Sequence, residues 1–220
     1  MGTIKNIVFD LGGVLMNFDF RGAVEKFSQL GLPLSVPDPS APIPPTGSAT
    51  QKTYQMINTY INGFVDEDQF ADILLPYCAK GINHADIKNT LLSLDGKFPA
   101  SRIESLLQLH RQYKVYLLSN INHHMWQRTL KMLADHHATP SDCFDATFLS
   151  YELHMAKPSP DIYRLMIDRT HIVPNETIYF DDLSENIEAG LQVGLQSVLV
   201  ESNNIEQCPA YISLLQQDNL

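Results

Sequence analysis

Two adjacent aspartates, Asp181 and Asp182, directly follow an apolar segment in the last quarter of the chain. Adjacent carboxylates repel each other unless a cation or hydrogen bonds compensate their charge. Mg²⁺ is a natural compensating ion, because it prefers oxygen ligands and usually takes one or two protein carboxylates. A third aspartate, Asp10, ends the first apolar segment and precedes the glycine pair Gly12–Gly13, which permits a tight turn beside a ligand. These acids indicate a metal site, although Asp10 taken alone is equally typical of a turn or a helix cap.

Hydroxyl, amide and amino groups occur in two further segments. Ser119 and Asn120 end a second apolar segment, and a helical pattern begins near Asn122. A helix N-terminus offers N–H groups to an anion, so these residues could bind the oxygens of a phosphate. Lys157 precedes two prolines that fix an extended turn and begin the next helix. Each motif also has a structural interpretation, Ser119 as a helix N-cap and Lys157 as a solvated surface residue.

Five short apolar segments precede or follow these groups, and they are typical of buried parallel strands: residues 4–9, 115–118, 146–149, 177–180 and 197–200. Helical patterns alternate with them, at residues 102–112, 160–169 and 186–193. Strand alternating with helix predicts an α/β fold with a doubly wound, Rossmann-like parallel sheet. Ligands bind at the carboxyl ends of the strands in such sheets, where the candidate residues lie.

About a hundred residues separate the first two predicted strands, and most of them have helical patterns, at residues 20–30, 50–62, 66–78 and 86–94. Connections in α/β domains usually take only a few residues. The chain is therefore expected to have an α/β core domain, residues 1–16 and 98–220, with an inserted all-helical cap domain, residues 17–97. Prolines concentrated within residues 33–50 break both helix and strand, so this segment is either a surface loop or a flap that contacts the substrate.

The charge balance limits the partners of the protein. The 220 residues include 15 Lys and Arg against 25 Asp and Glu, a net charge of −10. This charge repels nucleic acid and anionic membranes, so neither is an expected partner. The three cysteines are widely spaced without a CxxC pair, which disfavours a zinc site or a disulfide framework. Without a signal peptide or a membrane span in its sequence, the protein is expected to be cytoplasmic.

In chain order, the four motifs resemble those of the haloacid dehalogenase-like superfamily, with Asp10, Ser119, Lys157 and the pair Asp181–Asp182 at the matching positions. The resemblance covers essentially the whole chain, including a helical cap inserted between the first two motifs. Residues 9–14, 118–120, 157–163 and 180–186 are similar to the subgroup that contains bacterial glucose-1-phosphate phosphatase. The phosphatase domain of epoxide hydrolases is similar too.

The resemblance implies a Mg²⁺-dependent phosphatase that hydrolyses a small phosphorylated metabolite, such as a sugar phosphate. Asp10 would attack phosphorus to give an aspartyl-phosphate, which water then cleaves. Lys157 would neutralise the phosphate and orient Asp10, and Ser119 and Asn120 would hold the phosphoryl oxygens. The implied metal ligands are Asp10, the carbonyl of Gly12, Asp182, and Asp181 directly or through water.

Gly12 departs from the family pattern, because phosphatases of this superfamily usually carry a second aspartate there as general acid and base. Such assistance is typically worth about 10²–10⁴-fold in rate. Three explanations are open: a substrate with a good leaving group, such as an anomeric or acyl phosphate; another acid, such as Asp19 or a cap residue; or binding of phosphorylated ligands with little turnover.

Two other enzyme classes are alternatives. A 2-haloacid dehalogenase shares the fold, the nucleophile and the lysine but uses no metal. The pair Asp181–Asp182 argues against it, because uncompensated carboxylates beside a carboxylate nucleophile are costly. A phosphoryl-transferring mutase is also compatible with the motifs. The eight histidines are expected to be ordinary helix and loop residues, with His123 or His124, near Ser119, the ones worth testing.

Overall fold

The computed structural model describes residues 3–34, 48–94 and 96–217. The chain divides into two compact units, one formed by Met1–Phe18 with Lys97–Leu220 and the other by Asp19–Gly96. The proline-rich segment, residues 33–50, lies largely outside the described residues. The roles of the two units as core and cap domains stay predictions.

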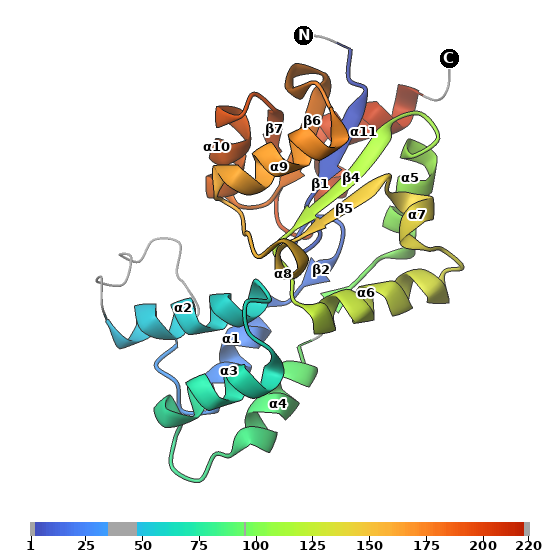
Figure 1. Cartoon of the computed structure of the whole chain (residues 1–220). Helices are drawn as coiled ribbons and strands as arrows, with labels where there is room; N and C mark the ends of the chain where they lie inside the picture. Colours follow the sequence, from blue (N-terminus) through green and yellow to red (C-terminus); the bar gives the residue numbers. More distant parts are fainter. Residues whose placement is uncertain (1–2, 35–47, 95, 218–220) are drawn as a thin grey trace. The chain divides into compact units, whose positions relative to one another are not determined.

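The first unit is built on a parallel sheet of five strands in the order β5-β4-β1-β6-β7 (Figure 1). The strands are β1 (Asn6–Phe9), β4 (Lys114–Ser119), β5 (Ala146–Leu149), β6 (Thr177–Asp181) and β7 (Gln196–Leu199). Two short strands, β2 (Asn17–Phe18) and β3 (Gly96–Lys97), pair separately. The predicted fold class is confirmed, and the five predicted strands differ from the observed ones only at their ends.

The register of the central strand brings distant parts of the sequence to one edge of the sheet. Phe9 of β1 is aligned with Leu117 of β4 on one side and with Phe180 of β6 on the other. The backbone N–H of Asp10 donates to the carbonyl of Phe180 at 2.9 Å. Asp10 and Asp181 therefore follow aligned residues and leave neighbouring strands at the same level.

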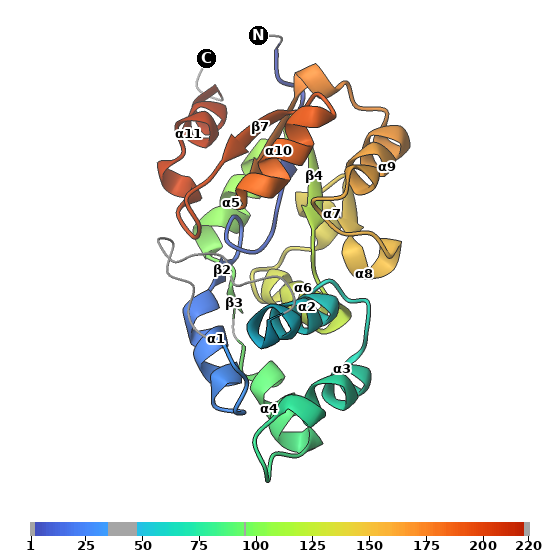
Figure 2. The same ribbon diagram turned by 90° about the vertical axis from the view of Figure 1, so that its left-hand side faces the viewer.

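Helices cover both faces of this sheet (Figure 2). Successive side chains of a strand point to opposite faces, so Phe9 packs with helices α5, α6 and α11, whereas Val8 packs with α9 and α10. The helices of this unit are α5 (Ala100–Leu109), α6 (His123–Asp135), α7 (Pro140–Cys143), α8 (Ser150–Leu153), α9 (Pro160–Thr170), α10 (Ser184–Gln192) and α11 (Pro209–Gln216), with 3₁₀ turns η2 (Pro174–Glu176) and η3 (Ile205–Gln207). The helices predicted before β4, before β6 and after β6 are confirmed.

The second unit is helical and has its own core. It contains α1 (Phe20–Ser28), α2 (Ala49–Ile61), α3 (Glu67–Leu74), η1 (Leu75–Tyr77) and α4 (His84–Leu92). Most of its buried residues form one cluster, in which the rings of Tyr60 and Phe70 stack at 4.8 Å. Helix α3 begins with a capping box, since the Asp66 side chain accepts from the N–H of Gln69 and the Gln69 side chain accepts from the N–H of Asp66.

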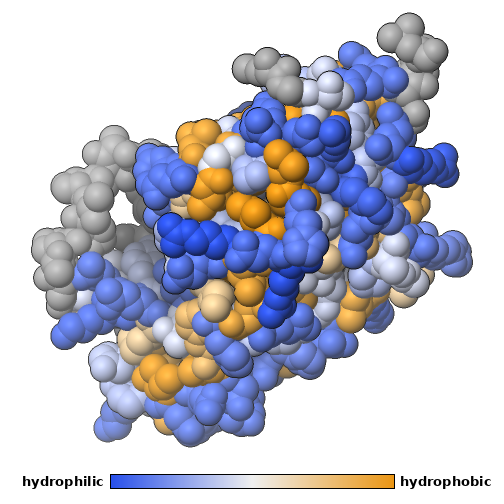
Figure 3. Space-filling model, turned by 45° about the horizontal axis from the view of Figure 1, so that its top comes forward, coloured by the Kyte–Doolittle hydropathy of each residue, from blue (hydrophilic) through white to orange (hydrophobic). Residues whose placement is uncertain are grey.

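Hydrophilic residues cover much of the face seen in Figure 3, with apolar residues among them, as is normal for a protein surface. Within residues 3–34, 48–94 and 96–217, no helix has the length and the apolar character that crossing a bilayer requires.

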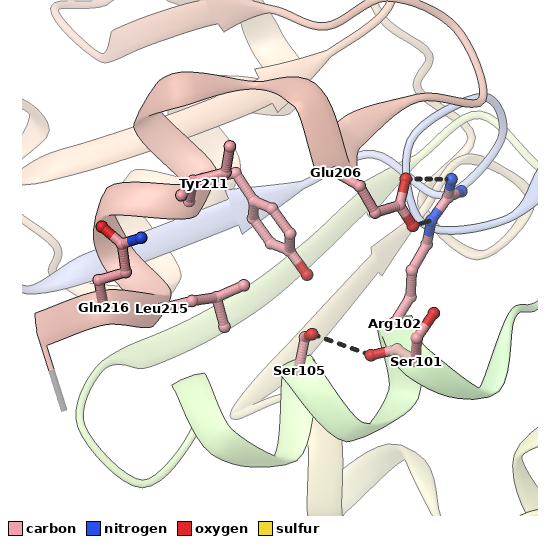
Figure 4. Close-up of a pocket in the computed structure, with 8 residues that line it drawn as sticks. Ser101, Arg102, Ser105, Glu206, Tyr211, Leu215 and Gln216 are labelled. Carbon is pink, nitrogen blue, oxygen red and sulfur yellow. Dashed lines mark hydrogen bonds and ion pairs between the residues drawn. The ribbon is translucent and has the colours of Figure 1, made fainter. Parts of the chain in front are cut away.

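Arg102 of α5 carries a buried charge that joins three segments of the first unit. Its Nε and Nη2 atoms donate to the carboxylate of Glu206 at 2.6 and 2.8 Å, an ion pair that Figure 4 shows at one end of a pocket of about 280 Å³. Nη1 donates to the carbonyl of Val14 and to Oδ1 of Asn17, and Nη2 also donates to the carbonyl of Asn203, each at 2.8 Å. The guanidinium thus fastens the loop after β1 to the segment after β7.

We expect Arg102→Ala to destabilise the protein by about 3 kcal/mol, because it leaves the buried carbonyl of Val14 and several part-buried acceptors without their donor. Urea denaturation measures the change. Arg164→Ala is the control, since Arg164 is exposed and pairs with the exposed Asp161, and it should cost less than about 1 kcal/mol. Equal losses from the two variants would show that the buried guanidinium does not hold the loop.

Candidate active site

The candidate residues lie at the carboxyl edge of the sheet. Asp10 follows β1, Ser119 ends β4, Asp181 ends β6, and Asp182 comes next. Lys157 belongs to the connection between α8 and α9.

Three carboxylates form one cluster. Asp10, Asp181 and Asp182 each offer an oxygen, and these oxygens all lie within 4.8 Å of one another. In the part of the chain that the structure describes, this is the one group of acidic, histidine or cysteine side chains arranged to hold a metal ion, and it contains no histidine. Asp181 and Asp182, at the end of β6, and Asp10, after β1, therefore lie together in one cluster.

The ammonium of Lys157 lies between two of these carboxylates. Its Nζ is 2.7 Å from Oδ1 of Asp10 and 2.7 Å from Oδ2 of Asp181. The Lys157 side chain is 1% exposed, and those of Asp10 and Asp181 are 11% and 0% exposed. The interpretation of Lys157 as a solvated surface residue is therefore wrong.

The backbone of Lys157 is held by Asn120. The Asn120 side chain donates to the Lys157 carbonyl at 2.9 Å and accepts from the Lys157 N–H at 2.8 Å. The next residue, Ile121, exchanges a similar pair of hydrogen bonds with the hydroxyl of Ser150. The segment after β4 is thus fixed on two sides, and the Asn120 amide side chain orients the lysine.

The N-cap of helix α6 is Asn122, whose side chain accepts from the N–H of Met125 at 2.8 Å. Ser119 belongs to β4 and is 2% exposed, so its interpretation as a helix N-cap is wrong. The N-terminus of α6 nevertheless follows directly after Ser119 and Asn120, as the sequence analysis expected.

Asp181 has hydrogen-bond donors on both of its oxygens. Oδ1 accepts from the N–H of Leu183 and from Nδ2 of Asn186, both at 2.9 Å. Oδ2 accepts from Lys157 and from the hydroxyl of Tyr179. A carboxylate with four donors has little capacity left for a metal ion, so Asp181 is built to hold Lys157.

The two glycines after Asp10 have different surroundings. Gly13 has φ +78°, and a Cβ built on it would lie 2.0 Å from Oδ2 of Asp182, so a larger residue would displace this carboxylate. A Cβ at Gly12 would have no neighbour within 4 Å. The absence of a side chain at Gly13 is therefore required by Asp182, whereas Gly12 has room for one.

Burial and neighbouring charges shift the pKa values of the clustered acids. Burial raises the pKa of Asp10 from 3.8 to about 7, against the opposing charge of Lys157 and with a further increase from Asp181. Burial also raises the pKa of Asp182, although a hydrogen bond from Ser202 lowers it in part. The site thus carries more negative charge than one lysine compensates, which favours a bound cation.

The ion pair shifts the pKa values of the other two charged groups in opposite directions. Although burial acts in the opposite direction, Lys157 and the hydrogen bonds to Asp181 lower the pKa of this carboxyl. Burial lowers the pKa of Lys157, but the charges of Asp10 and Asp181 outweigh it and raise the pKa above its ordinary value. Lys157 is therefore an ammonium at neutral pH.

Asp19, considered as a replacement acid, has a structural role. Its side chain accepts from the N–H of Gly22 at 2.8 Å and caps helix α1. His123 contacts Tyr151 edge-on, with ring centroids 5.7 Å apart, and its ring hydrogen-bonds to Gln127. His124 also lies in the first turn of α6 and is no member of the acidic cluster.

Two residues beside the site were not identified from the sequence. Tyr179 contacts Asp181, and alternation along β6 places the two side chains on one face, a signal that could have found it. Ser202 contacts Asp182 from the segment after β7, which no sequence spacing relates to the acids.

Comparisons with known proteins show the family of this chain. Residues 4–194 match the model of the haloacid dehalogenase-like hydrolase family. A D-ribitol-5-phosphate phosphatase from Bacteroides thetaiotaomicron is 30% identical over 202 residues, which are 90% of this chain and 93% of that protein. A phosphatase from Mycobacterium tuberculosis is 24% identical over 90% of this chain and 88% of its own length. The bifunctional epoxide hydrolase 2 of Sus scrofa is 34% identical over 61 residues, 28% of this chain and 11% of that protein.

Solved structures show the same similarity over nearly the whole chain. A haloacid dehalogenase family enzyme from Bacteroides thetaiotaomicron, crystallised as a magnesium complex, has a TM-score of 0.77 and 26% identity, covering 96% of this chain and 99% of that one. A predicted family hydrolase from Porphyromonas gingivalis has a TM-score of 0.76 and 25% identity, covering 98% and 99%. The chain belongs to the haloacid dehalogenase-like hydrolase family, so it is a hydrolase, and the resemblance inferred from its motifs is confirmed.

The pKa of Asp10 predicts a pH dependence of stability. Because the folded pKa is raised, the stability that the protonated group contributes is complete below pH 3.8 and is lost as the pH rises toward 7. In EDTA, we therefore expect wild-type protein to lose about 2 kcal/mol of unfolding free energy relative to Asp10→Asn between pH 5 and pH 7.

Denaturation at several pH values measures this difference. Asp161→Asn, a substitution of an exposed acid, is the control, and its unfolding free energy relative to wild type should not change between pH 5 and pH 7. A difference between wild type and Asp10→Asn that does not change with pH would contradict the raised pKa.

Proposed function

We propose that the protein is a Mg²⁺-dependent phosphatase of a small phosphorylated metabolite, a sugar phosphate or sugar alcohol phosphate. The observation that carries this proposal is the cluster of Asp10, Asp181 and Asp182 with Lys157 between two of them. The similarity to a D-ribitol-5-phosphate phosphatase over 90% of the chain supports the substrate class.

Asp10 is the proposed nucleophile. Lys157 binds its Oδ1, which leaves Oδ2 to attack the phosphorus of the ester. This step forms an O–P bond to Asp10 and breaks the bond to the leaving alcohol oxygen. Water then attacks the same phosphorus, which releases phosphate and regenerates the carboxylate, so one difficult displacement becomes two easier ones.

The residues present fit a magnesium ion. The cluster supplies hard oxygen donors and more negative charge than Lys157 balances. We assign the ion to Asp10, Asp182 and the carbonyl of Gly12, with Asp181 contributing through water. When bound, Mg²⁺ neutralises charge on the phosphate that otherwise repels the carboxylate nucleophile.

The phosphoryl oxygens are assigned to the segment after β4. We propose that they bind the hydroxyl of Ser119, the backbone N–H of Asn120 and the ammonium of Lys157. The two hydrogen bonds between the Asn120 side chain and the Lys157 backbone keep these groups together before the substrate arrives. Preorganised donors of this kind stabilise the charge of the transition state.

The lack of an acidic side chain at Gly12 favours a second candidate function, the binding of phosphorylated ligands with little turnover. Neither Asp181, which has four donors, nor Asp19, which caps α1, is free to replace an acid at this position. A substrate with a good leaving group, such as an anomeric or acyl phosphate, needs no such acid.

Turnover of a panel of phosphate esters tests the proposal. We expect phosphate release in Mg²⁺ from a panel that includes D-ribitol 5-phosphate, an anomeric sugar phosphate and an acyl phosphate. EDTA and, separately, Asp10→Asn should abolish it, whereas Asp161→Asn should not.

Activity that is indifferent to EDTA and to Asp10→Asn would reject the mechanism. Thermal stabilisation by the phosphates without product release would favour the binding function. Halide release from 2-chloropropionate without metal would favour the dehalogenase.

We expect Gly12→Asp to raise the rate on esters with poor leaving groups by about tenfold or more, because it adds a general acid where there is room for a side chain. The rate on p-nitrophenyl phosphate, whose leaving group needs no proton, should change little. Gly12→Ala is the matched control for the change in backbone freedom and should bring no gain. If Gly12→Asp brings none either, another group already supplies the proton.

A further inference from the structure

Tyr179 contacts Lys157 and one of the two carboxylates that hold it, Asp181. It lies on β6 two residues before Asp181, so the two side chains share one face of the sheet. Its hydroxyl donates to Oδ2 of Asp181, the oxygen that also accepts from Lys157. The Lys157 ammonium lies 5.8 Å from the centroid of the Tyr179 ring.

The position of the Tyr179 ring is well defined by its packing. The residue is fully buried, and its ring meets that of Tyr163 edge-on with centroids 5.7 Å apart. Tyr163 is fixed in turn, because its hydroxyl donates to the carbonyl of Asn186 at 3.1 Å. A Cβ at Gly190 of α10 would lie 2.9 Å from the Tyr179 ring, so a glycine there makes room for it.

We propose that Tyr179 is a positioning residue for Lys157, an inference that rests on the proposed phosphatase function. By donating to Asp181, the hydroxyl fixes the orientation of this carboxylate and takes up part of its negative charge. The ammonium then remains shared between Asp181 and Asp10, with 2.7 Å to each.

Loss of the hydroxyl changes the balance between the two carboxylates. Asp181 would keep its full charge for Lys157, and charges attract strongly in a buried site. The ammonium would move toward Asp181 and away from Asp10 and the phosphoryl group. This displacement weakens the interaction between Lys157 and the phosphoryl group, which becomes stronger as charge develops in the transition state. Ser119 and the backbone N–H groups still bind the substrate.

Tyr179→Phe tests this role because it keeps the ring and removes the hydroxyl. We expect kcat to fall by about tenfold, the scale of one hydrogen bond to a charged group. KM and the Mg²⁺ concentration for half-maximal activity should stay within about twofold, as Ser119 and Asp182 are untouched. A kcat equal to that of the wild type would overturn the proposal.

Tyr116→Phe is the matched control. Tyr116 lies on β4 in the same buried cluster as Tyr179, and the charges that act on its hydroxyl are those of Asp145 and Lys114. Its kcat should stay within about twofold of wild type. An equal fall in both variants would overturn the positioning role, since it would reflect a general loss of packing.

A double-mutant cycle asks whether Tyr179 acts through Asp181. In the Asp181→Asn background, Tyr179→Phe should lower kcat no further, because the carboxylate it orients is gone. An equal fall in both backgrounds would overturn the proposal. Should Tyr179→Phe fail to fold, a fluorinated tyrosine at position 179 keeps the ring and alters the hydroxyl. The protein with fluorinated tyrosine at position 179 must then differ from wild type in kcat, and the protein with fluorinated tyrosine at position 116 must not.

Turnover by the wild type distinguishes a failure of the proposed phosphatase function from a failure of the positioning role of Tyr179. A wild type without turnover on the ester panel would overturn the proposed function, and this inference with it. An active wild type with an equally active Tyr179→Phe variant would overturn the positioning role alone.

Discussion

The site depends on one buried ammonium shared by two carboxylates. Lys157 is 1% exposed and lies 2.7 Å from both Asp10 and Asp181. A charge removed from water is costly unless its partners have good geometry and their remaining hydrogen bonds are satisfied. Asn120 holds the backbone of Lys157, and Tyr179 and Asn186 hold the carboxylate of Asp181. The parallel register of β1 and β6 brings the two acids to the same level, so the ion pair is a consequence of the sheet.

Asp181 and Asp182 are adjacent in the sequence but are held differently. Asp181 accepts from four donors and fixes the lysine, whereas Asp182 meets Ser202 and lies where Gly13 has no side chain. With Asp10, the cluster has three carboxylates and one ammonium, and burial raises the pKa of Asp10. The cluster therefore suits the joint binding of a divalent cation and an anionic substrate.

Much of this organisation could be predicted from the sequence, because it depends on local patterns. Apolar segments of strand length, each ending in a polar residue, predicted both the sheet and the edge at which Asp10, Ser119 and Asp181 lie. The roles of Asn120 and Ser202 could not be predicted, since they depend on which loops pack together in three dimensions. Arg102 is similar: its position on a helix gives no sign that its five N–H groups bind segments about ninety residues before and a hundred after it.

The proposed mechanism requires the Asp10 carboxylate to become covalently attached to phosphorus. Acid quenching during turnover of a substrate with a labelled phosphoryl group, followed by peptide mapping, tests it directly. We expect one labelled phosphoryl group on the peptide that contains Asp10, present during turnover and absent from Asp10→Asn. Phosphate release without label on this peptide, or label attached at another residue, would contradict it.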